Sequence, residues 1–228
     1  MNVDAYLERI GYRGSREPTF ETLSALHRAH MLSVPFENLD IHLGRRLVLD
    51  REANFEKVVV RRRGGWCYEL NGLFGLLLER LGFAVTMLGA RVVGERVGKE
   101  LGHLMLRVDL DRPWLADVGF GESSLVPIPL GDEPEQVVEA DGMRREFALV
   151  PRRLEEFQAM CEFSQTSPDM IFTQRRLCTL ATAEGRITLS DLRLIERAGD
   201  RVAERELAGE DEWRSVLRER FGVVLGDY

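Results

Sequence analysis

The spacing of hydrophobic residues changes along this chain, and each period predicts a different kind of element. In the first eighty residues, apolar side chains recur at the i, i+3, i+4, i+7 spacing of one helix face. This spacing predicts helices at 4–10, 19–31 and 55–61, with a loop at 34–40 and a short strand or turn at 47–49. A longer helix is predicted from Cys67 to a terminating Gly82. Its apolar stripe consists of Leu70, Leu73, Phe74, Leu77, Leu78 and Leu81.

From Phe83 onward the apolar residues alternate, as they do on a strand with one buried face. The chain between 111 and 113 is a turn, and 94–102 is a charged loop. Because helices precede strands instead of alternating with them, the pattern favours an α+β fold over a doubly wound parallel sheet. The predicted strands are 83–93, 103–110, 114–118, 177–182, 187–195 and 202–207, and the predicted later helices are 153–163 and 211–221.

A candidate nucleophile stands where the longest predicted helix begins. Cys67 follows Gly64, Gly65 and Trp66, and it precedes the apolar stripe by three residues, which places it on the buried side of the first turn. The helix dipole and the unpaired N–H groups of that turn favour a thiolate. The glycines would let a substrate approach the backbone closely. The alternative is an inert, buried cysteine at a helix start.

Two partners for this thiol are predicted on the first hairpin. His103 lies on the strand face opposite the leucine and valine residues, and Asp117 interrupts an apolar strand, where a carboxylate needs a charged partner. If the turn pairs Asp109 with Pro113, His103 and Asp117 become diagonal neighbours on one face. The imidazole could then take the thiol proton while the carboxylate fixes its tautomer. A histidine with only a structural hydrogen bond is the alternative.

Composition and charge remove other classes of function. The 228 residues are 44% hydrophobic and 30% charged, and the formal net charge of −7 argues against binding nucleic acid or an anionic membrane. No uncharged run approaches the roughly 20 residues of a membrane span. The histidines and cysteines are too scattered to form a metal site, so we expect no bound metal. Short arginine clusters at 61–63 and 175–176 could still serve an anionic cofactor.

Cysteine usage indicates the compartment. Cys67, Cys161 and Cys178 cannot all pair within one chain. No apolar core follows the opening residues as it would in a signal peptide. We therefore expect a reducing, cytoplasmic location. The sequence carries no signal for an oligomeric state.

With these residues in view, the chain resembles the arylamine N-acetyltransferase family. The likeness covers roughly residues 1–125 and 155–225, and its most specific part is the cysteine motif together with the order and spacing of His103 and Asp117. The matching segments are Pro35-Phe36-Glu37-Asn38-Leu39, Arg63-Gly64-Gly65-Trp66-Cys67-Tyr68-Glu69-Leu70-Asn71, Gly102-His103, Asp117-Val118-Gly119-Phe120-Gly121, Ser167-Pro168 with Phe172-Thr173, and the run from Leu177 to Leu189.

The resemblance implies a fold and a reaction. The fold would be an N-terminal helical bundle at 1–82, an antiparallel β-barrel at 83–152 and a C-terminal α/β lid at 153–228, around a Cys-His-Asp core like that of cysteine proteases. The reaction would be ping-pong acetyl transfer with acetyl-coenzyme A (acetyl-CoA) as co-substrate. In it, acetyl-CoA acylates the cysteine, and an arylamine, arylhydrazine or N-hydroxyarylamine then takes the acetyl group.

The resemblance also implies roles for particular residues. The nucleophile, the general base and the orienting carboxylate would be Cys67, His103 and Asp117. The walls of the acceptor pocket would be Phe36, Val93 and Phe120, for which ordinary core packing is the alternative. Contacts to coenzyme A would come from Gly102 and Thr182. A structural ion pair beside the site would join Glu37 and Arg63.

Between about 126 and 155 the chain is shorter than the family usually is. We expect the barrel to lack several strands, the stretch 129–145 to be a charged, glycine-containing linker, and the clefts to be more open. The same triad would also suit a transglutaminase-like or papain-like thiol hydrolase, or an amide synthase of the same family that uses a tethered acyl chain. A degenerate family member that only binds ligands is the non-enzymatic alternative.

Overall fold

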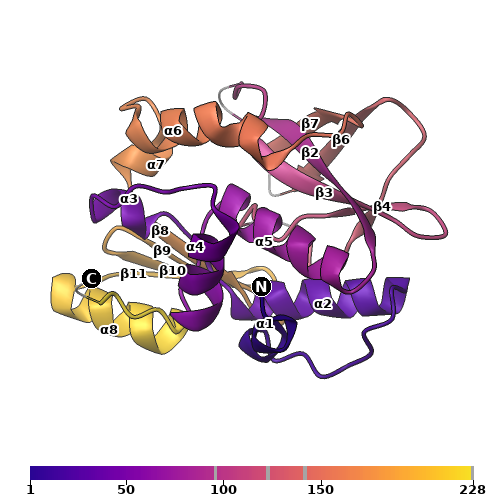
Figure 1. Ribbon diagram of the computed structural model, residues 1–228. Coiled ribbons are helices and arrows are strands. Elements are labelled where there is room, and N and C mark those ends of the chain that lie inside the picture. The colour runs from indigo at the N-terminus through magenta and orange to yellow at the C-terminus, as the bar shows by residue number, and fades with distance from the viewer. Residues whose placement is uncertain (95–96, 122–123, 141–142, 227–228) are drawn as a thin grey trace.

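Two antiparallel sheets and a set of helices make up the protein. The computed structural model describes residues 1–94, 97–121, 124–140 and 143–226. One sheet has the strand order β5-β4-β3-β2-β7-β6 and the other β1-β8-β9-β10-β11. In Figure 1 the first sheet curls at the upper right, the second lies at the lower left, and helix α5 runs through the middle. The predicted α+β class is confirmed.

Helices dominate the first eighty residues, and most of them begin at a capping side chain. Asn2, Thr19 and Asp50 each stand just before a helix, and their side-chain oxygens accept hydrogen bonds from its first N–H groups. The helices of this region are α1 (Val3–Arg9), α2 (Phe20–Ser33), α3 (Leu39–His42), α4 (Arg51–Phe55) with its π-helical continuation η1 (Glu56–Val60), and α5 (Cys67–Arg80).

Two predictions in this region are wrong. The segment 34–40 is more than a loop, because it holds the short strand β1 (Phe36–Glu37) and the start of α3. Residues 47–49 form neither the strand nor the turn that was predicted. The reason is that the amide of Gln165 takes the place of a partner strand: it accepts from the Leu47 N–H at 2.8 Å and donates to the Leu47 carbonyl at 3.1 Å.

Helix α5 is the centre of the main core. Every residue from Cys67 to Leu78 is buried, including the polar Glu69 and Asn71. Gly75 lets the helix approach the curled sheet, since a Cβ there would lie 3.2 Å from the side chain of Leu106. A helix that is covered on all sides must satisfy its polar side chains internally. The partners of Glu69 and Asn71 therefore matter for everything that follows.

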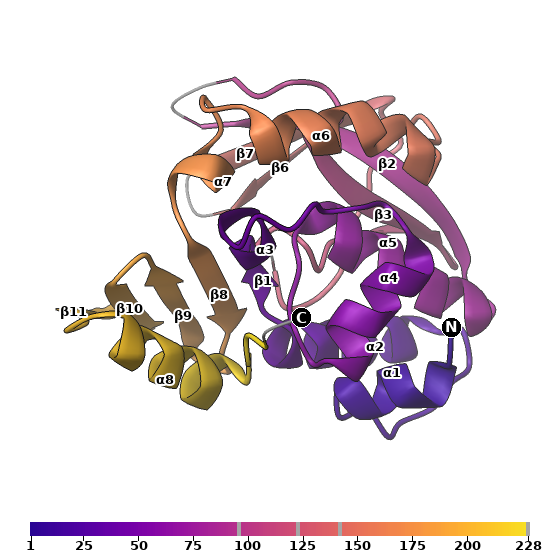
Figure 2. The same cartoon turned by 60° about the vertical axis from the view of Figure 1, so that its left-hand side comes forward.

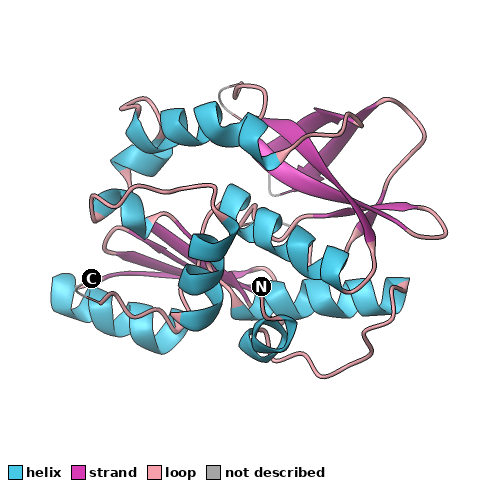
Figure 3. Ribbon diagram, in the orientation of Figure 1, coloured by secondary structure: helices cyan, strands magenta, loops and turns pink. Residues whose placement is uncertain are grey.

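The curled sheet packs one face on α5 and keeps a smaller apolar cluster on the other. That second cluster includes Leu88, Met105 and Phe147. The expectation of a linker at 129–145 is wrong, because much of this stretch forms a hairpin that extends the sheet beyond β2 (Figure 3). The strands are β2 (Ala84–Val93), β3 (His103–Asp109), β4 (Pro113–Ala116), β5 (Ile128–Pro129), β6 (Glu135–Ala140) and β7 (Met143–Ala148).

Helix α8 lies along the C-terminal sheet, as Figure 2 shows, and the two share a hydrophobic core of their own. Residues 187–195 are not the single predicted strand: they divide between β9 and β10 at Asp191, whose φ of +50° makes a tight turn. The elements here are η2 (Leu154–Phe157), α6 (Gln158–Thr166), α7 (Ile171–Gln174), β8 (Leu177–Ala181), β9 (Gly185–Ser190), β10 (Arg193–Ala198), β11 (Arg201–Glu206) and α8 (Glu210–Phe221). None of the helices in the described ranges is long and apolar enough to cross a membrane.

Strand β1 joins the C-terminal sheet to the segment that leads into α5. Phe36 pairs with Thr179 of β8 on one side and forms a parallel bridge with Gly65 on the other. The next residue, Glu37, is fully buried and accepts from the Arg63 guanidinium at 2.7 and 3.0 Å. The ion pair expected between Glu37 and Arg63 is therefore present.

This buried pair sets up a stability prediction. Arg63→Met should lower the free energy of unfolding by about 3–5 kcal/mol, because it leaves the Glu37 carboxylate buried without its cation. Urea denaturation of the two proteins measures the difference. Arg16→Met is the matched control, since Arg16 pairs with Asp4 on the surface, and it should change stability little. If Arg63→Met and Arg16→Met lowered the free energy of unfolding equally, burial would not be what makes the Glu37–Arg63 pair important for stability.

Candidate active site

Cys67 is the first residue of α5, directly after the N-cap Trp66. The turn is fastened by Glu69, whose carboxylate accepts from the Trp66 N–H at 3.0 Å. Lys57 balances this buried carboxylate with an ammonium group 2.9 Å away. The thiol thus stands at the positive end of a helix whose first turn is held by a buried ion pair.

The two glycines before the nucleophile serve close packing of the chain. A Cβ at Gly64 would lie 2.2 Å from the Pro35 carbonyl oxygen, and one at Gly65 would lie 2.8 Å from a Glu69 carboxylate oxygen. Neither glycine has a positive φ. The two glycines thus leave room for the Pro35 carbonyl and for Glu69, and their role in admitting a substrate stays a prediction.

His103 and Asp117 meet as the hairpin register predicts. Asp109 pairs with Pro113, and His103 Nε2 lies 2.8 Å from Asp117 Oδ2. The predicted contact is confirmed. An ionised carboxylate only accepts hydrogen bonds, so Nε2 carries the proton and Nδ1 keeps its lone pair. The imidazole therefore has its basic nitrogen turned away from the carboxylate.

The Asp117 carboxylate receives four hydrogen-bond donors from four segments. Oδ1 accepts from Asn71 Nδ2 at 2.8 Å and from the Gly119 N–H at 3.1 Å. Oδ2 accepts from His103 and from Arg145 Nη1, the latter at 2.5 Å. Burial alone would raise the pKa of Asp117, but these partners hold it well below the usual range. The carboxylate is therefore ionised at neutral pH.

Asn71 and Gly119 tie this carboxylate to the nucleophile helix. Asn71 stands one turn after Cys67 and donates to Asp117 and to the Leu104 carbonyl, at 2.8 and 2.6 Å. A Cβ at Gly119 would lie 2.7 Å from the Cys67 Cα. Within the described part of the chain, no hydrogen bond joins the Cys67 thiol to His103. The two are brought together through their neighbours.

Burial raises the pKa of the Cys67 thiol, the reverse of the lowered pKa predicted from its helix position. Only 6% of the residue is exposed, so desolvation of the thiolate outweighs the backbone of Leu104 and Tyr68, which acts in the opposite direction. A lone thiolate is therefore disfavoured here. The thiol can lose its proton readily only to a base held beside it.

Comparison with known proteins agrees with this geometry. A family model described as N-acetyltransferase matches residues 19–145 and 143–228. Human arylamine N-acetyltransferase 1 is 34% identical over 275 residues, which cover 99% of this chain and 95% of the human protein. The chain belongs to the arylamine N-acetyltransferase family.

Solved structures of other family members have the same fold. The arylamine N-acetyltransferase from M. tuberculosis superposes with a TM-score of 0.91 at 30% identity, over 97% of this chain and 94% of that chain. The Mycobacterium marinum arylamine N-acetyltransferase, solved in complex with CoA, gives a TM-score of 0.89 at 28% identity, over 97% and 93%. That relative binds coenzyme A.

This chain is shorter than the human relative that it matches, as expected, and the place of the shortening between about 126 and 155 stays a prediction. The alignment with the human protein spans 275 residues, more than the 228 of this chain, so the relative has residues without a counterpart here. The two segments matched by the family model meet at residues 143–145.

The three residues expected to form the acceptor pocket do not all lie beside His103. Phe36 lies against Gly121, with its ring centroid 6.1 Å from that of Phe172. Phe120 packs edge-on to His103, with ring centroids 5.1 Å apart. Val93 lies elsewhere: Ala90 is the β2 residue opposite His103, and Val93 is three residues, about 10 Å, further along the strand. Phe120 therefore contacts the imidazole of His103, whereas Val93 lies about 10 Å along β2 from the residue that pairs with His103.

The residues expected to contact coenzyme A lie in two different segments. Gly102 directly precedes His103, and its N–H donates to the Lys99 carbonyl. Thr182 directly follows β8, and its N–H donates to the Gly185 carbonyl. Both are partly exposed. The structure does not bring them into contact with each other through any hydrogen bond within the described ranges.

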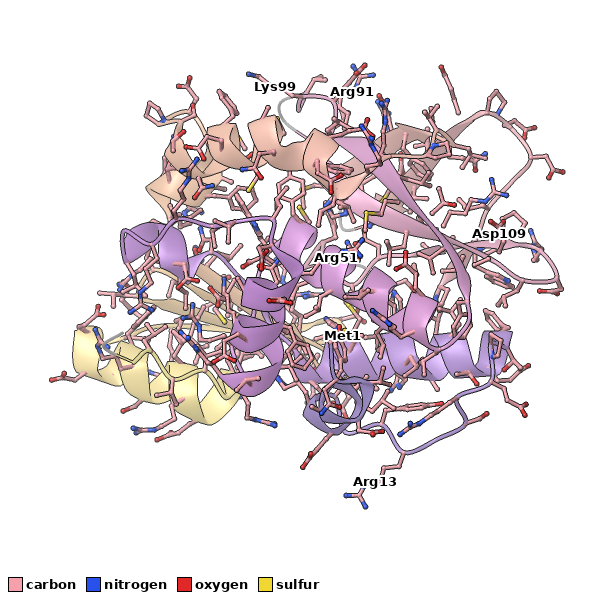
Figure 4. The ribbon with its side chains drawn as sticks, viewed as in Figure 1. Met1, Arg13, Arg51, Arg91, Lys99 and Asp109 are labelled. Carbon is pink, nitrogen blue, oxygen red and sulfur yellow. The ribbon has the colours of Figure 1, made fainter. Side chains whose placement is uncertain are left out.

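One cavity of the described residues lies apart from the triad. It measures about 370 Å³ and lies over β2, β6 and β7, with a mixture of acidic and basic side chains that includes Arg91, Glu146 and Arg152. Arg91 stands along the upper edge of the molecule in Figure 4, as does Lys99. None of the three triad residues lines this cavity.

Three contributors to the site were missed from the sequence. Asn71 belongs to the cysteine motif, and its i+4 spacing from Cys67 indicates that the two side chains share one face of the helix. His27 accepts from the Asp117 N–H with Nε2 at 3.2 Å. Arg145 lay in the expected linker, and its alternation with Phe147 was the only sign that it faces inward.

The close packing of Gly119 against the start of α5 can be tested by adding a methyl group at position 119. Gly119→Ala should reduce the reactivity of Cys67 at least tenfold and lower stability by about 1–3 kcal/mol, because the methyl group meets the Cys67 backbone. Gly72→Ala is the matched control on the same helix: its Cβ would contact Leu154 at an ordinary 3.5 Å, so stability should rise slightly. Iodoacetamide labelling and urea denaturation report the two quantities. An active, stable Gly119→Ala protein would contradict the packing.

The buried histidines predict a loss of stability in mild acid. Burial lowers the pKa of His27 to about 4 and that of His30 well below its usual 6.5. The folded state therefore binds fewer protons than the unfolded state below pH 6.5. The free energy of unfolding should fall between pH 6.5 and 5, by up to about 1.4 kcal/mol per pH unit for each histidine.

Urea denaturation at several pH values measures this slope. His27→Gln should make the slope shallower, since it removes one of the two groups that must stay neutral. A free energy of unfolding that is constant from pH 7 to 5 would contradict the assignment of both histidines as neutral, buried groups.

Proposed function

We propose that this enzyme transfers an acetyl group from acetyl-CoA to an arylamine or arylhydrazine through a thioester on Cys67. Membership of the family and the solved CoA complex of the Mycobacterium marinum relative support the co-substrate. The observation that carries the proposal is the attachment of the nucleophile helix to the His103–Asp117 couple through Asn71 and Gly119.

In the first half-reaction, His103 Nδ1 takes the proton of the Cys67 thiol as the sulfur attacks the acetyl carbonyl carbon. The negative charge that develops on the carbonyl oxygen can be held by the N–H of Tyr68 and a neighbouring group at the start of α5. When the tetrahedral adduct collapses, the bond to the sulfur of coenzyme A breaks. The imidazolium returns the proton to that sulfur, and coenzyme A leaves as a thiol.

In the second half-reaction, the amine nitrogen attacks the thioester carbonyl while His103 takes a proton from it. The bond to the Cys67 sulfur then breaks, the thiol regains its proton, and the acetylated amine leaves. Asp117 remains ionised throughout and stabilises the imidazolium in both halves. Because a lone thiolate is disfavoured by burial, the sulfur is charged only while the imidazole holds its proton.

The remaining residues have roles that follow from the family resemblance. Phe36, Val93 and Phe120 would bound the aryl ring, and Gly102 and Thr182 would contact coenzyme A. We propose that 153–228 acts as a lid over the bundle at 1–82 and the sheet at 83–152. A free thiol as nucleophile fits a reducing, cytoplasmic location.

Intact-protein mass spectrometry tests the proposal. Incubation with acetyl-CoA should add one acetyl group, and an arylamine such as 4-aminosalicylate or a hydrazide such as isoniazid should then remove it. Cys67→Ala should prevent the adduct, whereas Cys178→Ala, which removes a buried cysteine of the other core, should not. Absence of any adduct on the wild type would contradict the proposal. An adduct formed only with a peptide amide would indicate a thiol hydrolase, and one formed only with a tethered acyl chain would indicate an amide synthase.

Asp117→Asn should fold but acylate at least 100-fold more slowly, because an amide can donate to Nε2 and leave the wrong ring nitrogen protonated. Rapid-quench measurement of the thioester gives the rate, and thermal unfolding checks the fold. An acylation rate equal to that of the wild type would make Asp117 a purely structural residue.

A further inference from the structure

Arg145 is a buried cation in direct contact with the catalytic carboxylate. Only 1% of it is exposed, and Nη1 lies 2.5 Å from Asp117 Oδ2, the same oxygen that accepts from His103. Its guanidinium also lies over the Phe120 ring, 4.4 Å from the centroid. Phe120 in turn packs edge-on to His103. Arg145 therefore contacts two of the groups that hold the imidazole.

Arg145 is carried to the site by strand β7 of the curled sheet. It stands in β7, within residues 143–145, where the two segments matched by the family model meet. The strand that carries it pairs with β2 on one side and β6 on the other. A side chain from an inner strand of the curled sheet thus reaches the Asp117 carboxylate.

Among the residues that the structure describes, four titratable or charged groups face Asp117, each from a different element. They are His103 on β3, Arg145 on β7, His27 on α2 and Cys67 on α5. Burial lowers the pKa of His27 to about 4, so His27 is neutral at pH 7. Arg145 is then the one permanent cation among these four groups. Its charge offsets part of the negative charge that Asp117 directs at the imidazole.

We propose that Arg145 is a positioning residue for the acyl transfer, which holds Asp117 in place and sets the charge that His103 and Cys67 experience. The inference rests on the proposed function of these two residues. A cation near a titratable group makes protonation harder, whatever the group. Removing this cation should therefore make the Cys67 thiol reactive only at higher pH.

The contact with Phe120 adds a consequence for the acceptor. Guanidinium groups favour the face of an aromatic ring, and here one face of Phe120 is covered by Arg145. An acceptor ring can therefore stack only on the part of Phe120 that Arg145 leaves open. Phe120 therefore offers the acceptor less aromatic surface than a ring with both faces open would.

The alternative is that Arg145 only fills space and stabilises the sheet. A purely structural arginine would affect the free energy of unfolding but not the pH dependence of the site. Substitutions of Arg145 that keep or remove its positive charge separate the positioning role from the purely structural one. Arg145→Lys keeps the charge, Arg145→Gln removes it, and Arg145→Met is a second neutral side chain for the case in which glutamine leaves the protein unfolded.

The experiment measures the rate of Cys67 alkylation by iodoacetamide as a function of pH, by mass spectrometry of the Cys67 peptide. This readout needs no acyl donor, so it is informative even if acetyl-CoA is not the co-substrate. Parallel rates of acylation by acetyl-CoA test the proposed function separately. Failure of the wild type to acylate, with normal alkylation, would reject the co-substrate and leave the role of Arg145 under test.

We expect Arg145→Gln and Arg145→Met to move the acid limb of the alkylation profile to higher pH by about one unit or more. Arg145→Lys should restore most of the wild-type profile. Arg144→Gln is the matched control, because Arg144 is the next residue of the same strand but is half-exposed and pairs with Glu146, and it should leave the profile unchanged. Neutral variants that fold and keep the wild-type acid limb would overturn the proposal.

Discussion

The buried carboxylate of Asp117 is the interaction on which the rest of the site depends. It lies beyond the end of β4 and collects donors from α5, β3, β7 and its own loop. A buried charge of this kind is tolerable only when every lone pair is occupied. Satisfying it therefore fixes the relative positions of helix α5 and strands β3 and β7. The proposed catalytic geometry and the fold depend on the same contacts.

A second buried network secures the other side of Cys67. Glu37 and Arg63 connect β1 to the segment before α5, while Lys57 and Glu69 hold the first turn of that helix. The glycine at position 64 lets the Pro35 carbonyl approach without a clash. The thiol is thereby placed rigidly in a site that disfavours its charge. Such a site suits a nucleophile that is ionised only when the base beside it takes the proton.

Local sequence patterns predict helix α5 and the contact between His103 and Asp117. The β6–β7 hairpin and the raised pKa of the thiol depend on packing between distant segments. The leucine stripe predicts α5 because it repeats for four turns, and the Asp111-Arg112-Pro113 turn sets the register that joins His103 to Asp117. The hairpin of β6 and β7 was missed because Arg145 interrupts the apolar alternation of its inward face. The raised thiol pKa depends on burial by segments distant in sequence, such as Gly119, and no helix-position argument contains that information.

The central claim is that α5 and the His103–Asp117 couple act as one unit, joined by Asn71. A double-mutant cycle on the single-turnover rate of Cys67 acylation tests it most directly, with Asn71→Ala, Asp117→Asn and the double variant. If the residues act as a unit, the double variant should be about as slow as the slower single variant. Two losses that simply multiply would show that Asn71 and Asp117 work independently, and would contradict the account.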